Sequence, residues 1–122
     1  MSMKNPEENI VLQKTKAFAL RCIKLYKYMV DEKREFVISK QVLRSGTSIG
    51  ANVKEALRGQ SRADFAAKMN IALKEASETE YWLELLFETG YLEENQYKKL
   101  NNDCGAIRKM LISSCKTLKE KK

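Results

Sequence analysis

The sequence predicts an all-α protein, an antiparallel up-and-down four-helix bundle in which residues 1–122 form one domain. One Pro and five Gly leave few chain breakers, which favours long helices over a turn-rich β-fold. Apolar residues recur at steps of three and four, the period of a helix that buries one face. Short breaks separate four such segments, so consecutive helices should lie side by side.

Start and stop signals delimit each element. The expected helices span about residues 6–30, 35–58, 62–89 and 93–119. Asn5 is the expected N-cap of the first, and Pro6 suits its first position because a missing N–H costs nothing there. Gly59 and Gly90 stand where a glycine commonly follows a helix end. Ser61 and Asp64 have the spacing of a capping box before the third helix.

The second and fourth helices each carry one narrow seam for the core, typical of nearly parallel helix packing. In the second helix the seam is Ile38, Val42, Ser45, Ile49, Val53 and Ala56. In the fourth it is Tyr97, Leu100, Cys104, Ile107, Leu111, Ser114 and Leu118.

The first and third helices carry more apolar surface than one bundle face needs. Broad apolar surface on a small protein usually marks a subunit contact, although helix ends and loops could also cover it. The candidate oligomer-interface residues are Ile71, Trp82, Leu85, Tyr26 and Ile23.

Small residues interrupt the second helix at Gly46 and Gly50, one turn apart, where each Gly costs about 1 kcal/mol relative to Ala. This cost favours a close approach of a neighbouring helix over a phosphate contact, because phosphate-binding glycines stand at helix starts. Ser48 and Asn52 are candidates for hydrogen bonds between helices.

The composition argues against catalysis. The chain has no His, and its three Cys show no C-x-x-C spacing, so we expect no catalytic residue, no metal site and no cofactor. The acidic run Glu75, Glu78, Glu80, Glu84 and Glu88 should form a solvated or salt-bridged face. No apolar run approaches the roughly 20 residues that span a bilayer, and no secretory segment opens the chain. We therefore expect a cytoplasmic protein without a membrane partner.

Charge is unevenly distributed within a formal net charge of +7. Residues 14–44 contain nine Lys or Arg against three acids, and residues 71–94 contain seven Glu against one Lys. Two basic stripes have helical spacing and are the predicted nucleic-acid-binding residues: Lys14, Arg21, Lys24 and Lys27 on the first helix, and Lys40, Arg44, Lys54 and Arg58 on the second.

Such stripes bind phosphate backbones in a salt-sensitive, sequence-poor manner. The sequence also allows two other interpretations of these basic stripes. The stripes could be ordinary solvated faces, or the acidic third helix could neutralise one of them across a subunit boundary.

Two segments resemble a known family. Residues 39–56, SKQVLRSGTSIGANVKEA, resemble the signature of the small four-helix bundle proteins encoded in bacterial 23S rRNA intervening sequences. Asp64-Phe65 followed by residues 70–81, NIALKEASETEY, resembles their second signature. The resemblance implies a bundle that assembles into a homopentamer. The same superfamily includes the accessory variability determinant of diversity-generating retroelements, whose basic barrel binds nucleic acid and a reverse transcriptase.

Two functions follow as hypotheses. The first is a non-catalytic oligomeric bundle that binds RNA or DNA through its basic helix faces. The second is a scaffold or accessory subunit that recruits an enzyme such as a reverse transcriptase, with the basic surface incidental.

Overall fold

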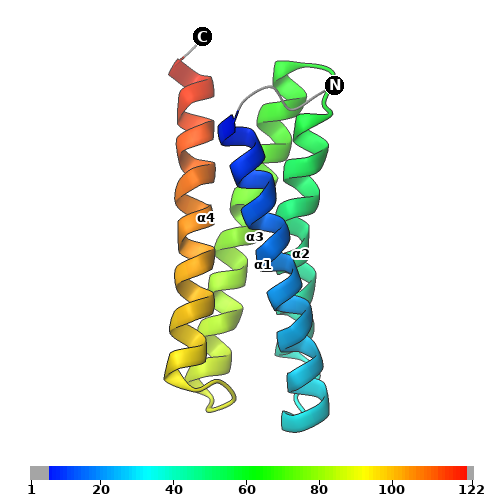
Figure 1. The fold of residues 1–122 in the computed structure, drawn as a ribbon, viewed down its shortest axis with the longest axis vertical. Helices are drawn as coiled ribbons and strands as arrows, with labels where there is room; N and C mark the ends of the chain where they lie inside the picture. Colours follow the sequence, from blue (N-terminus) through cyan, green and yellow to red (C-terminus); the bar gives the residue numbers. More distant parts are fainter. Residues whose placement is uncertain (1–5, 121–122) are drawn as a thin grey trace.

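The computed structural model describes residues 6–120, which form four long helices lying side by side (Figure 1). The helices are α1 (Pro6–Tyr28), α2 (Ile38–Leu57), α3 (Arg62–Glu88) and α4 (Glu94–Glu120), and a π-helical turn, η1 (Met29–Lys33), extends α1. The described residues contain no strand, and none of their helices is both long enough and apolar enough to cross a bilayer. The all-α prediction is confirmed, while the predicted N-cap Asn5 lies outside the described residues.

Local signals set the ends of α3 as predicted. The Ser61 hydroxyl accepts the N–H of Asp64 at 3.0 Å, which makes Ser61 the N-cap. At the other end Gly90 has φ +86°, a conformation that glycine adopts without strain. The N–H of Tyr91 donates to the Leu86 carbonyl at 2.9 Å, and the N–H of Gly90 donates to the Phe87 carbonyl at 3.1 Å. These two bonds form a Schellman motif, which satisfies carbonyls that the helix end leaves free.

The predicted start of α2 at residue 35 is wrong by three residues. Arg34 adopts a left-handed conformation with φ 56°, and its N–H donates to the Met29 carbonyl, which closes η1. The Glu35 carboxylate then accepts the N–H groups of Val37, Ile38 and Ser39 at 3.1, 2.9 and 2.7 Å. A side chain that takes three donors of the first turn acts as a cap, so the helix begins after Glu35.

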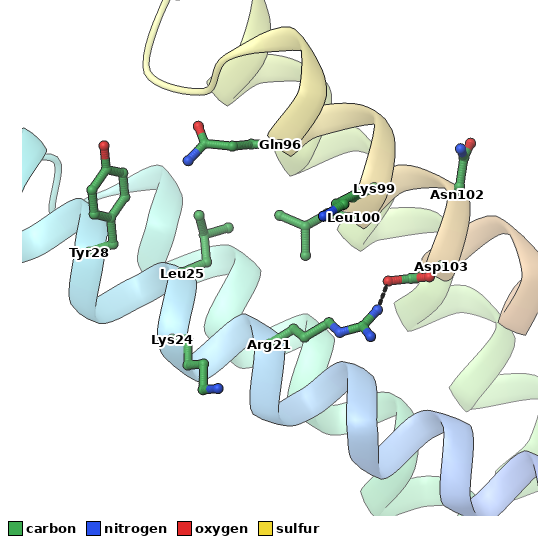
Figure 2. Close-up of a pocket in the computed structure, with 9 residues that line it drawn as sticks. All are labelled: Arg21, Lys24, Leu25, Tyr28, Gln96, Lys99, Leu100, Asn102 and Asp103. Atoms are coloured by element: carbon green, nitrogen blue, oxygen red, sulfur yellow. Dashed lines mark hydrogen bonds and ion pairs between the residues drawn. The ribbon is translucent and has the colours of Figure 1, made fainter.

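Contacts run in opposite orders along neighbouring helices, as the ribbon also shows (Figure 1). Between α2 and α3, for example, Ser45 meets Thr79 and Glu55 meets Lys68. The chain packs α1 on α2, α2 on α3 and α3 on α4, whereas α1 and α4 meet more loosely. An open groove separates parts of these last two helices (Figure 2).

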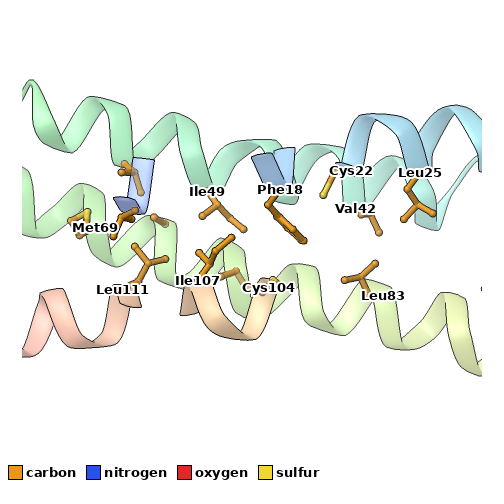
Figure 3. Packing of buried hydrophobic residues seen from close by; sticks show 14 of the residues in the cluster. Phe18, Cys22, Leu25, Val42, Ile49, Met69, Leu83, Cys104, Ile107 and Leu111 are labelled. Atoms are coloured by element: carbon orange, nitrogen blue, oxygen red, sulfur yellow. Dashed lines mark hydrogen bonds between the residues drawn. The ribbon is translucent and has the colours of Figure 1, made fainter. Parts of the chain in front are cut away.

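The core runs the length of the bundle and draws on all four helices (Figure 3). Phe18 and Cys22 of α1, Ile49 of α2, Leu83 of α3 and Leu111 of α4 are at most 1% exposed. Each large apolar side chain buried in this way stabilises the fold by about 1.5–3 kcal/mol. The predicted seams of α2 and α4 line this core with two exceptions in α4. Ser114 is only partly buried and donates to the Met110 carbonyl of its own helix, and the side chain of Leu118 lies outside the described residues.

The two glycines of α2 bring this helix close to α1. A Cβ on Gly46 would overlap the Sγ of Cys22, and a Cβ on Gly50 would lie 3.3 Å from the Thr15 hydroxyl. The packing role predicted for both glycines is therefore confirmed.

The predicted inter-helix hydrogen bonds of Ser48 and Asn52 are wrong. Ser48 donates to the carbonyl of Arg44, and Asn52 donates to the carbonyl of Ser48, so both bonds stay within α2. A helix lets short polar side chains reach carbonyls one turn back, which satisfies them locally. The buried polar link between α2 and α3 is made instead by the Thr79 hydroxyl, which donates to the Ser45 hydroxyl at 2.7 Å.

Candidate nucleic-acid interface

The outer side of α1 presents a row of cations. Lys14, Arg21, Lys24 and Lys27 are all exposed, with Lys16 at their edge, and the core residues of α1 lie on its other side. Within the described part of the chain, Lys14, Lys24 and Lys27 form no ion pair. The predicted stripe is therefore exposed, with most of its charge uncompensated among the described residues.

Arg21 is the exception in this row. Its guanidinium pairs with the carboxylate of Asp103 on α4 (Figure 2). The pair joins two helices that otherwise meet loosely, so part of the Arg21 charge is already balanced within the chain.

The stripe on α2 divides into two parts. Lys40, Arg44, Lys54 and Arg58 are all exposed, as predicted. Arg44 pairs with two carboxylates of α3, those of Glu75 at 3.4 Å and of Glu78. The acidic helix thus neutralises part of this stripe within one chain.

A second cationic cluster lies where α2 turns into α3. Lys54 and Arg58 line an open pocket there together with Lys68 of α3. The Lys68 ammonium pairs with the Glu55 carboxylate at 2.9 Å, and Asp64 also lines the pocket. Three cations and two carboxylates share this site, so its excess positive charge is smaller than that of the α1 face.

The acidic run of α3 forms a face that is salt-bridged along part of its length and solvated along the rest, as predicted. Besides the two carboxylates that hold Arg44, Glu80 accepts from Arg108 of α4 at 2.7 Å. Glu84 and Glu88 are exposed to solvent.

The residues predicted to form an oligomer interface are partly accessible. Ile71 is 40% exposed, whereas Trp82, Leu85, Ile23 and Tyr26 are half-buried. The Trp82 indole N–H donates to the Glu78 carboxylate at 3.1 Å. The sequence reading missed other exposed apolar side chains: Ile10, Leu20, Phe36, Val37, Tyr81 and Ile112.

The buried cysteines lack the properties of nucleophiles. Burial raises the pKa of Cys22 to about 12, and burial together with the Glu80 carboxylate raises the pKa of Cys104 as well. Both thiols are therefore protonated near neutral pH and closed off from solvent. Among the described residues, no three His, Cys, Asp or Glu side chains gather as metal ligands would.

The α1–α4 groove adds residues that the sequence reading missed. Gln96, Lys99, Asn102 and Asp103 of α4 line it together with Arg21 and Lys24 of α1. Lys99 falls in the basic C-terminal part of the chain, and this local excess of positive charge is the only feature of the sequence that could have indicated it as a binding residue. Its neighbours across the groove depend on how the first and last helices pack.

Comparison with known proteins gives a family and a fold. The 23S rRNA-intervening sequence protein family matches residues 7–113. A crystal structure of a protein with unknown function, from the S23 ribosomal protein family of Bacteroides thetaiotaomicron, superposes with a TM-score of 0.89. It is 59% identical in sequence, and the match covers 90% of this chain and 98% of that chain. None of the curated proteins matches.

The family match spans nearly all of the described helices and contains both signature segments, residues 39–56 and 64–81. The similar crystal structure shares the fold over almost its whole length. On this evidence the chain belongs to the family of 23S rRNA-intervening sequence proteins.

Proposed function

We propose that the protein is a non-catalytic, oligomeric bundle of the cytoplasm that binds the phosphate backbone of RNA or DNA through its basic helix faces. The observation that carries the proposal is the exposed row of Lys14, Lys24 and Lys27 on α1, which has no ion-pair partner among the described residues. Lysines that neutralise phosphates release condensed counterions, which drives binding with little regard to sequence.

The predicted binding residues differ in what they offer. Lys54 and Arg58 lie at the α2–α3 turn and Lys40 near the start of α2, so they form a second cationic surface, separate from the α1 row that reaches toward α4. Arg21 and Arg44 already hold carboxylates, so each must exchange a partner to contact a phosphate. We therefore rank α1 as the main contact surface.

Three further observations support parts of the proposal. The family's description refers to a 23S rRNA insertion, which makes RNA the first nucleic acid to test. The two buried cysteines, Cys22 and Cys104, are thiols, as is usual where the cytoplasm keeps cysteines reduced. The exposed Ile71 and the half-buried Trp82, which lie about three turns apart along α3, support association of several copies, and the family resemblance suggests a pentamer.

The alternative is a scaffold that recruits a protein partner, such as a reverse transcriptase. The turn between η1 and α2 favours it, because Phe36 and Val37 are 51% and 72% exposed there. Adjacent apolar side chains at a turn can anchor a partner. In that case the cations of α1 would be incidental.

Salt dependence separates the two functions. Binding of fluorescently labelled RNA and DNA is measured by anisotropy over a range of salt concentrations. We expect log affinity to fall linearly with log salt, with a slope of about −2 for single strands and nearer −3 for duplex DNA if three phosphates are neutralised, and steeper if more are. Lys24→Glu should weaken binding at least about fivefold and reduce the slope by about 1.

The control is Lys74→Glu, which makes the same charge change at an exposed position of the acidic helix α3. It should bind almost as well as the unchanged protein. Absence of RNA and DNA binding even at low salt, or equal losses in both variants, would refute the proposed function.

A further inference from the structure

An open groove of about 650 Å³ lies between the C-terminal half of α1 and the first turns of α4 (Figure 2). The residues that line it are Arg21, Lys24, Leu25, Tyr28, Gln96, Lys99, Leu100, Asn102 and Asp103.

The groove has an apolar floor and an aromatic end. Leu25 and Leu100 approach each other from opposite sides (Figure 2), with Leu25 8% exposed and Leu100 half-buried. The ring of Tyr28 is 37% exposed beside them. A flat aromatic ring next to an apolar floor offers a surface on which a nucleobase can stack.

The rim of the groove is cationic. Lys24 and Lys99 stand on opposite helices, and neither forms an ion pair with another described residue. Arg21 pairs with Asp103, the one carboxylate that lines the groove. The Lys33 ammonium lies over one face of the Tyr28 ring, 5.9 Å from its centre, so it adds a positive charge at that end and a base would stack on the opposite face.

We infer that this groove binds single-stranded nucleic acid, with bases on Tyr28 and the leucine floor and phosphates along Lys24 and Lys99. A duplex keeps its base faces stacked on one another, so it could use the lysines but not the apolar floor. Unpaired bases expose their faces, and every base can stack, which fits binding with little sequence preference. The inference rests on the proposed function and narrows it to the single-stranded form.

Anisotropy titrations of the full chain test the inference, with labelled oligo(U) and oligo(dT) of about 12 nucleotides and a duplex of the same length. We expect both single strands to bind at least about fivefold more tightly than the duplex. Tyr28→Ala should weaken single-strand binding at least about fivefold and leave duplex binding almost unchanged. Tyr28→Phe keeps the ring and should bind as the unchanged protein does.

Matched controls lie outside the groove. Tyr81→Ala removes an exposed ring from α3, and Lys98→Ala removes a charge next to Lys99 on α4. Tyr81→Ala should have no effect, and Lys98→Ala should weaken single-strand binding less than Lys99→Ala does.

Other outcomes would overturn either the groove assignment or the proposed function. Duplex binding as tight as single-strand binding, or equal effects of Tyr28→Ala and Tyr81→Ala, overturns the groove assignment while the proposed function stands. Loss of subunit association in Tyr28→Ala and Lys99→Ala would show that a second copy occupies the groove, which also overturns it. Absence of all nucleic-acid binding removes the proposed function itself.

Discussion

At the scale of single residues, the contact between Gly46 and Cys22 explains a local weakness of α2. Glycine lowers helix stability by about 1 kcal/mol relative to Ala, yet no larger residue fits against the Cys22 thiol. The close approach that glycine permits brings Phe18 and Ile49, both fully buried, into the same core. Packing between helices therefore offsets the cost of glycine within one helix.

We predict that Gly46→Ala destabilises the protein by about 1–2 kcal/mol, because overpacking outweighs the gain in helix propensity. Urea denaturation measures the change. Gly105→Ala on α4 is the control, since its Cβ would meet no atom closer than 3.6 Å, and it should stabilise the fold by up to about 1 kcal/mol. Combining Gly46→Ala with Cys22→Ala should recover stability. A neutral or stabilising Gly46→Ala would contradict the packing role.

Exposure of the basic residues could be predicted from the sequence, because helical spacing alone assigns residues to the core or to solvent. All eight predicted cations are exposed in the structure. Their ion pairs could not be predicted in the same way. Arg21 pairs with Asp103 and Arg44 with Glu78, residues that are far apart in the chain and meet only after the helices pack.

At the scale of elements, helix ends were predictable where short-range signals set them. Ser61 and Gly90 act within one turn of the chain, so their residue types carry the information. The start of α2 was not predictable, because Glu35 is a capping residue outside the common set of Ser, Thr, Asp and Asn. Its role depends on the turn that Arg34 makes in the left-handed conformation.

We predict that Glu35→Gln destabilises the protein by about 1–2 kcal/mol at neutral pH, because a charged acceptor for three N–H groups is lost. Burial alone would raise the pKa of Glu35, but the N–H donors of Ile38, Ser39 and Val37 outweigh it and hold the pKa below its usual value. A lowered pKa in the folded state means that the stabilisation is complete above the unfolded pKa of about 4.3. It is lost as the pH falls through the folded pKa.

Denaturant unfolding at several pH values measures this effect. The difference between the unchanged protein and Glu35→Gln should shrink as the medium becomes acidic. Glu32→Gln, an exposed position in η1, should change stability by less than about 0.5 kcal/mol. A difference that stays constant down to strongly acidic pH would argue against the charged cap.

At the scale of the whole molecule, the sequence predicted four helices and their core seams but not the groove between α1 and α4. Seams show which face of a helix is buried, and this is a property of each helix alone. The distance between the first and last helices depends on how all four pack, and here it leaves Leu25 and Leu100 facing across an open space. The candidate site therefore combines predictable cations with a shape that only the fold reveals.

Self-association is the part of the proposed function that concerns the whole molecule, and α3 gives the sharpest test of it. Ile71 is 40% exposed, so a charge there is tolerated in a single copy but would be costly in a subunit contact. We predict by light scattering a mass several-fold above 14.1 kDa at micromolar concentration, and a smaller mass for Ile71→Lys with its helical content intact. Ile112→Lys on α4, where the side chain is 44% exposed, should keep the native assembly. A native chain with the mass of a single copy would refute self-association, and an unchanged mass for Ile71→Lys would place the contact elsewhere than at Ile71.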